Sequence, residues 1–130
     1  MTARKKAGKT TGKSAGQGAV EAHPLLSEEA VGLVAARFRA LGDASRVRLL
    51  NLLMQGEASV QDLVAASGLT QTNVSRHLGL LRREGVVARR KDGNRAVYSI
   101  ADPNIVTMCE LVCGALETRL GDGLAAMQGE

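Results

Sequence analysis

The chain has very few aromatic residues, with one Tyr, one Phe and no Trp among its 130 residues. Its core is therefore expected to consist of Leu, Val and Ala. No apolar run is long enough to cross a membrane, so no membrane partner is expected. The apolar segment of a signal peptide is also missing, because Gly, Gln and Glu interrupt residues 15–26. These absences predict a cytoplasmic protein.

Positive charge is concentrated at the N-terminus. Residues 1–20 hold five basic residues and no acidic one, and they contain almost nothing apolar to bury. This composition predicts a disordered basic arm over residues 1–22. The next segment, residues 23–120, has the length of one domain, and residues 121–130 are expected to form a flexible tail.

Residues 58–85 predict two short helices joined by a tight turn. Gly68 is suited to end the first helix in a left-handed conformation, and Thr70 is suited to cap the second. At about 100° per residue, three apolar side chains of the second helix form one narrow stripe, which would pack on the first helix. The stripe consists of Val74, Leu78 and Leu81, and the facing residues are Val60, Leu63 and Val64.

The opposite face of the second helix is polar and cationic. Arg76 is the strongest candidate for reading a base, because its planar fork can bond both acceptors of one guanine. Arg83 lies further along the same face, and short hydrogen-bonding side chains lie near the helix start, where base contacts are usually made. These short residues are Gln71, Thr72 and Ser75. A helix-turn-helix inserts such a helix into the major groove of double-stranded DNA, so we call it the recognition helix.

Two β-prone runs between residues 86 and 100 follow the recognition helix. Asp92-Gly93 between them is a strong signal for a two-residue type I′ turn, and the hairpin would form a wing beside the DNA backbone. Residues 74–95 hold seven Arg or Lys against two acidic residues, which is typical of phosphate binding. A winged domain used only for protein interaction would lack this cluster. The predicted phosphate contacts are Arg89, Arg90, Lys91 and Arg95.

Three further helices are predicted around this unit. A first helix starts after Ser27, a second after Asp43, and a last one at Asp102-Pro103, where a capping residue precedes proline. The fold class is therefore mainly α, with five helices and a β-hairpin wing. The inward residues of the second helix are predicted to be Val47, Leu50 and Leu53.

The first and last of these helices each carry an apolar stripe that one small core does not need. We therefore expect a homodimer built from these two helices, which would set two recognition helices about one DNA turn apart. The stripe of the first helix consists of Val31, Val34, Ala35, Phe38 and Leu41. The stripe of the last helix consists of Ile105, Cys109, Val112, Cys113, Leu116 and Leu120.

Together these segments resemble the ArsR/SmtB family of small dimeric repressors. The resemblance covers roughly residues 25–120 and rests on FRALGDASRVRLLNLL, TNVSRHLGLLRREGVV and GNRAVYSI, in that order. It implies a winged helix-turn-helix dimer of five-helix subunits that binds an operator near its own gene and is released by a metal ion or another inducer. It also implies base contacts by Thr72, Ser75 and Arg76, and a wing that touches the minor groove or the backbone.

The metal ligands of that family are mostly absent from this chain. At the start of the third helix, Ser59 and Gln61 stand where the family has two cysteines. Of the four ligands of the family's zinc site in the last helix, only Asp102 is matched. The second helix contains no cysteine, so a thiol pair between the second and last helices is not available. The three unmatched positions of the zinc site hold Asn104, Ala115 and Thr118.

Cys109 and Cys113 remain as the candidate inducer site. Four residues apart on one helix, their Cβ atoms would lie about 5–6 Å apart, whereas a disulfide needs about 3.5–4.5 Å, so a bridge between them is not expected. Two thiolates can bind a thiophilic metal or metalloid ion, and thiols can also respond to an oxidant. The alternative is that both are small buried hydrophobic residues and that the inducer is an organic ligand or a protein partner.

Catalysis is not expected from this chain. It has two histidines, and His77 lies beside the apolar stripe of the recognition helix, where a packed histidine is expected. No set of nucleophile, base and acid can be assembled from these histidines and a cysteine pair on an apolar stripe. The sequence therefore predicts a DNA-binding transcriptional regulator with no certain cofactor. Its expected partners are double-stranded DNA and a second copy of itself.

Overall fold

The computed structural model describes residues 22–121, so residues 1–21 of the predicted arm and the predicted tail after residue 121 lie outside the described residues. The described residues fall into two units, which divide between residues 35 and 36. The helix α1 (Glu28–Leu41) begins in the first unit and ends in the second. It starts where predicted, because the Ser27 hydroxyl accepts a hydrogen bond of 3.1 Å from the backbone N–H of Ala30.

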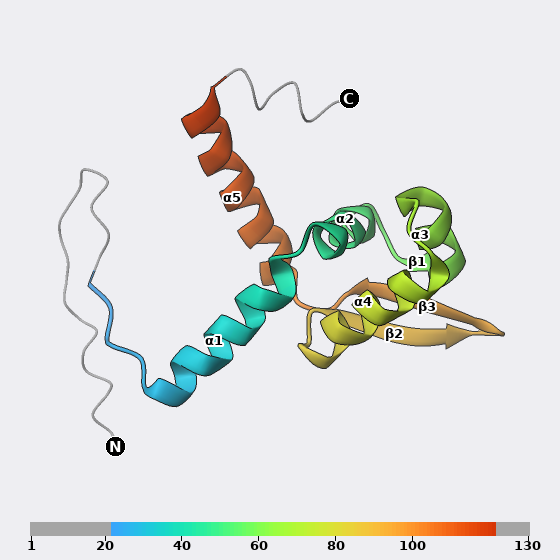
Figure 1. Cartoon of the computed structure of the whole chain (residues 1–130), viewed down its shortest axis with the longest axis horizontal. Coiled ribbons are helices and arrows are strands. Elements are labelled where there is room, and N and C mark those ends of the chain that lie inside the picture. The colour runs from blue at the N-terminus through green and yellow to red at the C-terminus, as the bar shows by residue number, and fades with distance from the viewer. Residues whose placement is uncertain (1–21, 122–130) are drawn as a thin grey trace. The chain divides into compact units, whose positions relative to one another are not determined.

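The second unit contains the remaining helices and strands (Figure 1). Its helices are α2 (Ala44–Leu53), α3 (Val60–Ser67), α4 (Gln71–Arg83) and α5 (Pro103–Leu120). Its strands are β1 (Ala58–Ser59), β2 (Val87–Asp92) and β3 (Arg95–Ile100). With α1, the described residues hold five helices and a β-hairpin, which confirms the predicted fold class. The recognition helix is α4, and β2 and β3 form the wing.

Short polar side chains and one glycine set the helix ends at the predicted positions. Asp43 caps α2, and Asp102 caps α5. Thr70 caps α4, because its hydroxyl accepts a hydrogen bond of 3.1 Å from the backbone N–H of Asn73. Gly68 ends α3 with a φ of +78°, a left-handed conformation that glycine adopts without steric cost.

The sheet has three antiparallel strands in the order β1-β3-β2, and the sequence does not predict β1. This strand pairs Ala58 with Tyr98 and Ser59 with Val97. Ser59 also caps α3, through a reciprocal pair of hydrogen bonds with Asp62. The strand and the cap together attach the start of α3 to the wing.

The turn of the wing lies one residue later than predicted. Asp92 pairs with Arg95, so the two-residue loop is Gly93-Asn94 and the predicted Asp92-Gly93 loop is wrong. Gly93 has a φ of +65°, the backbone conformation that a type I′ turn requires at its first central residue. The glycine therefore opens the loop, and Asp92 remains in the strand.

The core lies between α2, α3, α4 and the sheet. One predicted core residue is wrong, because Val47 is 49% exposed and Leu49 is buried in its place. At about 100° per residue, Val47 lies roughly 110° from the middle of the buried stripe of α2, which explains its exposure. That stripe consists of Leu49, Leu50 and Leu53.

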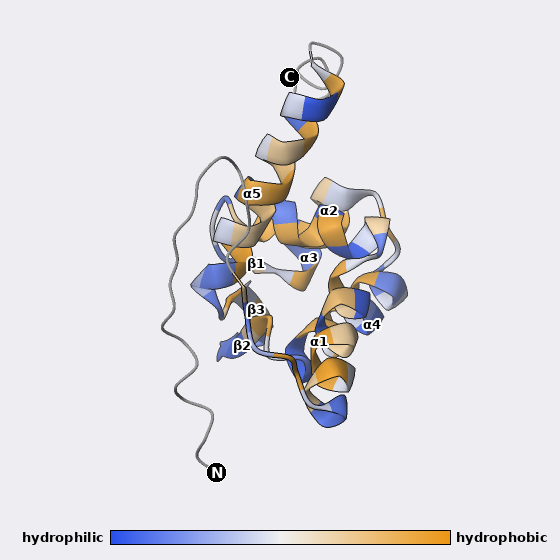
Figure 2. Ribbon diagram, turned by 90° about the vertical axis from the view of Figure 1, so that its left-hand side faces the viewer, coloured by the Kyte–Doolittle hydropathy of each residue, from blue (hydrophilic) through white to orange (hydrophobic). Residues whose placement is uncertain are grey.

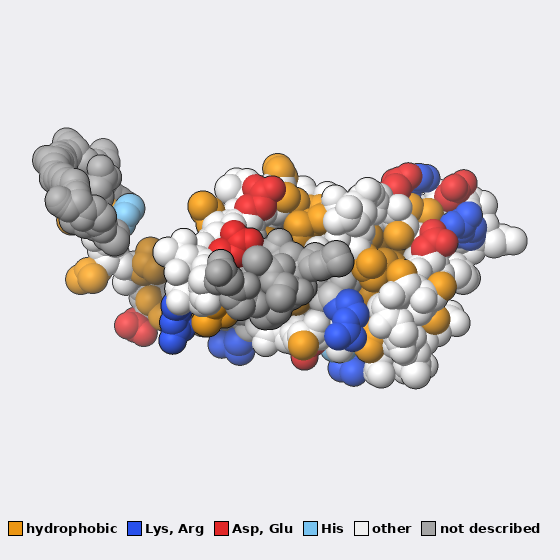
Figure 3. All heavy atoms as spheres, turned by 90° about the horizontal axis from the view of Figure 1, so that it is seen from above, with side chains coloured by type: hydrophobic (Ala, Val, Ile, Leu, Met, Phe, Trp, Pro, Cys, Tyr) orange, Lys and Arg blue, Asp and Glu red, His pale blue; other side chains and the backbone are white. Residues whose placement is uncertain are grey.

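The helices α1 and α5 contribute little to this core. Ala40 is the buried residue of α1, and Ile105 is the buried residue of α5. Figure 2 shows apolar residues along much of α5, and Figure 3 shows hydrophobic side chains at the surface among charged ones. None of the helices in residues 22–121 combines the length and the apolarity needed to cross a membrane. The large exposed hydrophobic residues of α1 and α5 are Val31, Leu33, Val34, Phe38, Leu111, Val112, Leu116 and Leu120.

Candidate nucleic-acid interface

The recognition helix α4 has one buried face and one exposed face. On the buried face, Val74, Leu78 and Leu81 have no exposed surface, and they belong to the core formed with α2 and α3. This burial agrees with the predicted apolar face of α4. The contacts of its polar face with DNA bases stay a prediction. The residues predicted to face DNA are all exposed, and they are Gln71, Thr72, Ser75, Arg76 and Arg83.

Asn73 is a polar residue of α4 that the sequence analysis misses. Its side-chain oxygen accepts a hydrogen bond of 3.0 Å from the guanidinium of Arg76, one turn later. Residues three apart on a helix are neighbours, so the spacing alone indicates this pair. The contact restricts the motion of the Arg76 fork before it meets a ligand, which lowers the entropy lost on binding.

The basic residues of the wing fall into two groups. Arg90 lies 2.7 Å from the carboxylate of Glu57, and Arg95 lies 3.4 Å from the carboxylate of Asp62. Arg89 and Lys91 form no ion pair with the acidic side chains of residues 22–121. Figure 3 shows acidic and basic side chains next to one another toward its right-hand end.

The ion pairs show which of the predicted phosphate contacts already have their charge matched within the chain. The Glu57 carboxylate is charged at neutral pH and compensates Arg90, whose hydrogen bond lowers the pKa of Glu57 further. Alternate residues of a strand point to opposite faces, so Arg89 points away from the side that carries Arg90. Arg89 therefore keeps an uncompensated positive charge, whereas the charge of Arg90 is already matched.

A second polar cluster lies behind the recognition helix, at Arg46 of α2. Its Nε donates to the backbone oxygen of Ala40 at 2.6 Å, and one terminal nitrogen donates to the backbone oxygen of Arg39 at 3.1 Å. The other terminal nitrogen lies 3.2 Å from Nδ1 of His77. Because an arginine can only donate, His77 accepts through Nδ1 and carries its proton on Nε2. Arg46 therefore connects the end of α1 to α4.

The protonation of His77 is expected to make the fold sensitive to acid. The side chain is 6% exposed, and burial together with the charge of Arg76 lowers its pKa from an ordinary value of 6.5. The unfolded chain therefore takes up the proton first as the pH falls, and stability is lost below about 6.5, by at most about 1.4 kcal/mol per pH unit for this group. Urea unfolding at pH of about 7.5 and about 5.5 measures the loss.

The variant His77→Gln is the matched control for this pH dependence, because it keeps a polar side chain but removes the titrating group. The free energy of unfolding of this variant should fall less between the two pH values than that of the original chain. An equal fall in both proteins would assign the acid sensitivity to other groups.

Cys109 and Cys113 are both free thiols on α5. Cys109 is half-buried and packs against the edge of the core, whereas Cys113 is exposed. Burial raises the pKa of the Cys109 thiol, and the neighbouring Cys113 adds to this rise. Within residues 22–121, no group of three His, Cys, Asp or Glu side chains gathers as metal ligands. The single chain therefore offers two adjacent thiols from one helix.

Comparison with known proteins gives the family of this fold. The family described as "Bacterial regulatory protein, arsR family" matches residues 43–89, from the cap of α2 to the first wing strand. Rv0081, an uncharacterized HTH-type transcriptional regulator of Mycobacterium tuberculosis, is 40% identical over 105 residues, which make up 80% of this chain and 92% of that protein. The chain belongs to the ArsR family. The predicted family is confirmed, and with it the role of a DNA-binding transcriptional regulator that is not an enzyme.

Solved structures show the same winged fold in similar proteins. The crystal structure of Rv0081 has a TM-score of 0.69 at 40% identity and covers 75% of this chain and 99% of that one. The homodimeric winged helix-turn-helix domain of Mb0332 from Mycobacterium bovis has a TM-score of 0.67 at 31% identity and covers 73% and 91%. AntR, an antimony-specific transcriptional repressor, has a TM-score of 0.69 at 29% identity and covers 82% and 97%.

Two residues at metal positions of the ArsR family have other contacts in this chain. Ser59 is 1% exposed and caps α3, as described above. Asp102 caps α5, and its carboxylate lies 3.5 Å from the guanidinium of Arg37. Both side chains therefore serve the fold of this ArsR-family regulator by fixing the starts of helices.

Proposed function

We propose that this ArsR-family chain is a homodimeric repressor that binds operator DNA through α4 and the wing and is released by an inducer. The observation that carries the proposal is the two-sided structure of α4. Its apolar side chains are buried on α2 and α3, which leaves Arg76 and its polar neighbours on an open surface. The width of an α-helix suits the major groove, and such a face presents donors and acceptors to base edges.

The proposed dimer explains the apolar surface of α1 and α5. Leu111 is 69% exposed and Phe38 is 58% exposed, and neither helix buries more than one residue in the single chain. Exposed apolar faces of this kind mark interaction surfaces. A second copy is the occupant we propose, since the similar domain of Mb0332 is homodimeric. Two-fold symmetry would then present two recognition helices to one side of the DNA at a separation of about 34–36 Å.

Replacing Arg76 with Ala is the direct test of base reading. Binding to a duplex selected by the full chain from a random pool should weaken by about 1–3 kcal/mol, and the preference at one base pair of each half-site should relax. Repeating the selection with the variant measures both effects. Arg76→Lys separates charge from fork geometry, because Lys keeps the charge but cannot form the paired bonds to guanine. An unchanged base preference in both variants would remove Arg76 as a reader.

For the inducer, we propose a thiophilic metal ion, a metalloid ion or an oxidant that acts on Cys109 and Cys113. The two thiols share one side of α5, and a symmetric dimer would supply a second pair. AntR, a similar repressor, is specific for antimony. The expectation that both cysteines are buried is wrong for Cys113, which is exposed. The contact of Cys109 with the core favours a second candidate, in which Cys109 is structural and the inducer is an organic ligand or a protein partner.

Converting Cys109 and Cys113 to Ser together distinguishes these two candidates. Release of the selected duplex is measured for both proteins with trivalent antimony, trivalent arsenic, cadmium, zinc and peroxide. We expect one of these agents to release the original chain and to leave the double variant bound. A double variant that is still released would place the sensor elsewhere, and an original chain that none of them releases would favour the second candidate.

A further inference from the structure

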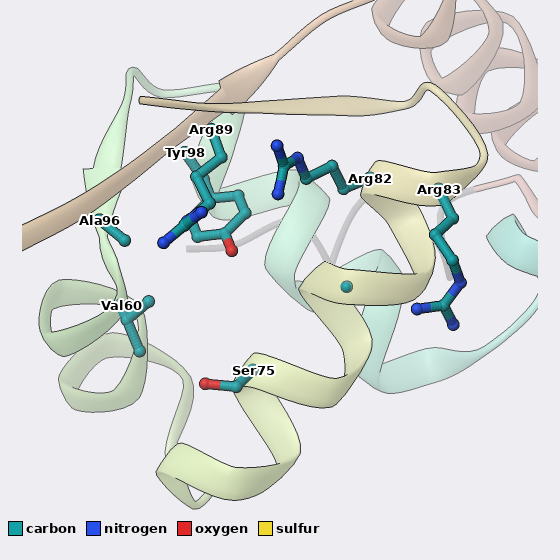
Figure 4. Close-up of a pocket in the computed structure, with 8 residues that line it drawn as sticks. Val60, Ser75, Arg82, Arg83, Arg89, Ala96 and Tyr98 are labelled. Carbon is teal, nitrogen blue, oxygen red and sulfur yellow. The ribbon is translucent and has the colours of Figure 1, made fainter. Parts of the chain in front are cut away.

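A cleft of about 480 Å³ lies between α4, the start of α3 and the inner side of the wing (Figure 4). Sites for whole small molecules span about 300–1,000 Å³, so this cleft has room for a phosphate group. Three arginines line this cleft, together with the apolar side chains of Val60 and Ala96. The lining residues that matter here are Ser75, Gly79, Arg82, Arg83, Arg89 and Tyr98.

The arginines of this cleft carry uncompensated charge. Ion pairs with acidic side chains are formed by Arg37, Arg90 and Arg95, whereas Arg82, Arg83 and Arg89 form none with the acidic residues of the described part of the chain. Arg82 and Arg89 carry like charges in one hollow, so an anion between them is attracted to both. The cleft is therefore built to receive negative charge from outside the chain.

The directions of the side chains agree with the binding of an anion in this cleft. Figure 4 shows the guanidinium groups of Arg82 and Arg89 reaching into the hollow from α4 and from β2, close to the hydroxyl of Tyr98. The hydroxyl of Ser75, about two turns before Arg82 on α4, points into the same hollow. Gly79 leaves the middle of α4 bare, since a Cβ there would meet only a terminal nitrogen of Arg83, at 3.7 Å.

We propose that this cleft binds one backbone phosphate of the DNA duplex, with Arg82 and Arg89 as the cations and Tyr98 as a hydrogen-bond donor. The inference rests on the proposed DNA binding and extends it to Arg82 and Tyr98, which the sequence analysis does not assign to the interface. The phosphate is expected to come from duplex DNA, because the cleft opens between α4 and the wing. In the proposed complex, these two elements flank the DNA backbone. A phosphate held there sets how deep α4 enters the groove, so these are positioning residues that do not read bases.

Gly79 allows a sharp test of the cleft. Gly79→Glu places a carboxylate beside the arginines, whereas Gly79→Gln adds the same bulk without charge, and both residues favour helix more than glycine does. Binding of the full chain to a selected duplex and to a scrambled duplex is measured between about 50 and 200 mM salt. We expect Gly79→Glu to bind both duplexes at least about tenfold more weakly than Gly79→Gln, because phosphate contact is independent of sequence.

The arginines themselves are tested by the salt dependence of binding. Arg82→Ala and Arg89→Ala should each reduce the slope of log K against log salt by about one, whereas Arg90→Ala, which removes a compensated charge, should reduce it less. In the selected duplex, neutral methylphosphonate at one backbone position of each half-site should weaken binding of the original chain more than binding of Arg82→Ala, which keeps only Arg89 and Tyr98 as partners of that phosphate. Adding inorganic phosphate at constant ionic strength should not compete, and saturable competition would overturn the proposal in favour of a free-anion site.

The experiments distinguish a failure of the phosphate cleft from a failure of the proposed DNA binding. If the original chain binds DNA, but Gly79→Glu matches Gly79→Gln and the arginine variants keep the original slope, the phosphate cleft is wrong and the DNA-binding role stands. If the original chain binds no duplex at low ionic strength, both proposals fall together.

Discussion

Replacing Val112 and Leu116 of α5 with Glu is expected to convert the protein to a monomer and to lower operator affinity at least about a hundredfold. Both side chains lie on the predicted apolar stripe and are exposed in the single chain, at 53% and 39%. In a symmetric dimer the two substitutions would bring four carboxylates into one apolar contact, and each unpaired buried charge costs several kcal/mol. Sedimentation equilibrium measures the mass, and fluorescence anisotropy with the selected duplex measures the affinity.

The matched control for this double variant is Thr107→Glu, an exposed position on the opposite side of the same helix. It introduces the same side chain into α5 without touching the stripe, so the protein should remain a dimer and keep its affinity. If the double variant stays dimeric, or if Thr107→Glu dissociates as well, the stripe of α5 is not the contact between subunits.

Truncating Leu78 to Ala is expected to destabilise the fold by about 2–5 kcal/mol. Leu78 has no exposed surface and lies on the buried face of α4, within the cluster that joins α2, α3 and the sheet. The cavity left behind would remove much of the roughly 5–15 kcal/mol by which a domain of this size is stable. Urea unfolding followed by circular dichroism gives the change as a shift of the midpoint at constant slope.

Leu80→Ala provides the same chemical change two residues away, at a half-buried position outside the core cluster. It should cost about 1 kcal/mol or less, since little buried contact is lost. Equal losses at both positions would show that the burial of α4 is not one-sided, which would weaken the basis for its exposed reading face.

The features that the sequence predicts well are those that depend on neighbouring residues. The caps at Thr70 and Asp102, the left-handed glycine at position 68 and the apolar stripe of α4 each involve residues within a few positions of one another. Capping geometry and helical periodicity are local rules, so a single sequence is enough to apply them. The misplaced turn is also local, and it differs by one residue because either Asp92 or Asn94 could flank the glycine.

Apart from the local Asn73–Arg76 pair and the exposure of Val47, the features missed in the sequence connect distant parts of the chain. Arg90 and Glu57 are 33 positions apart, as are Arg95 and Asp62, and Arg46 is 31 positions from His77. No periodic pattern relates such residues, so the sequence alone could not show which wing arginines are compensated. The strand β1 is only two residues long and exists through its pairing with β3, which is also a distant contact.

The most direct test of the central claim is the stoichiometry and selectivity of DNA binding by the full chain. A duplex selected from a random pool and a scrambled duplex of equal length are titrated at physiological ionic strength, with anisotropy as the signal. We predict two chains per selected duplex and an affinity at least about a thousandfold above that for the scrambled duplex. Equal affinity for the two duplexes, or no binding even at low ionic strength, would contradict it.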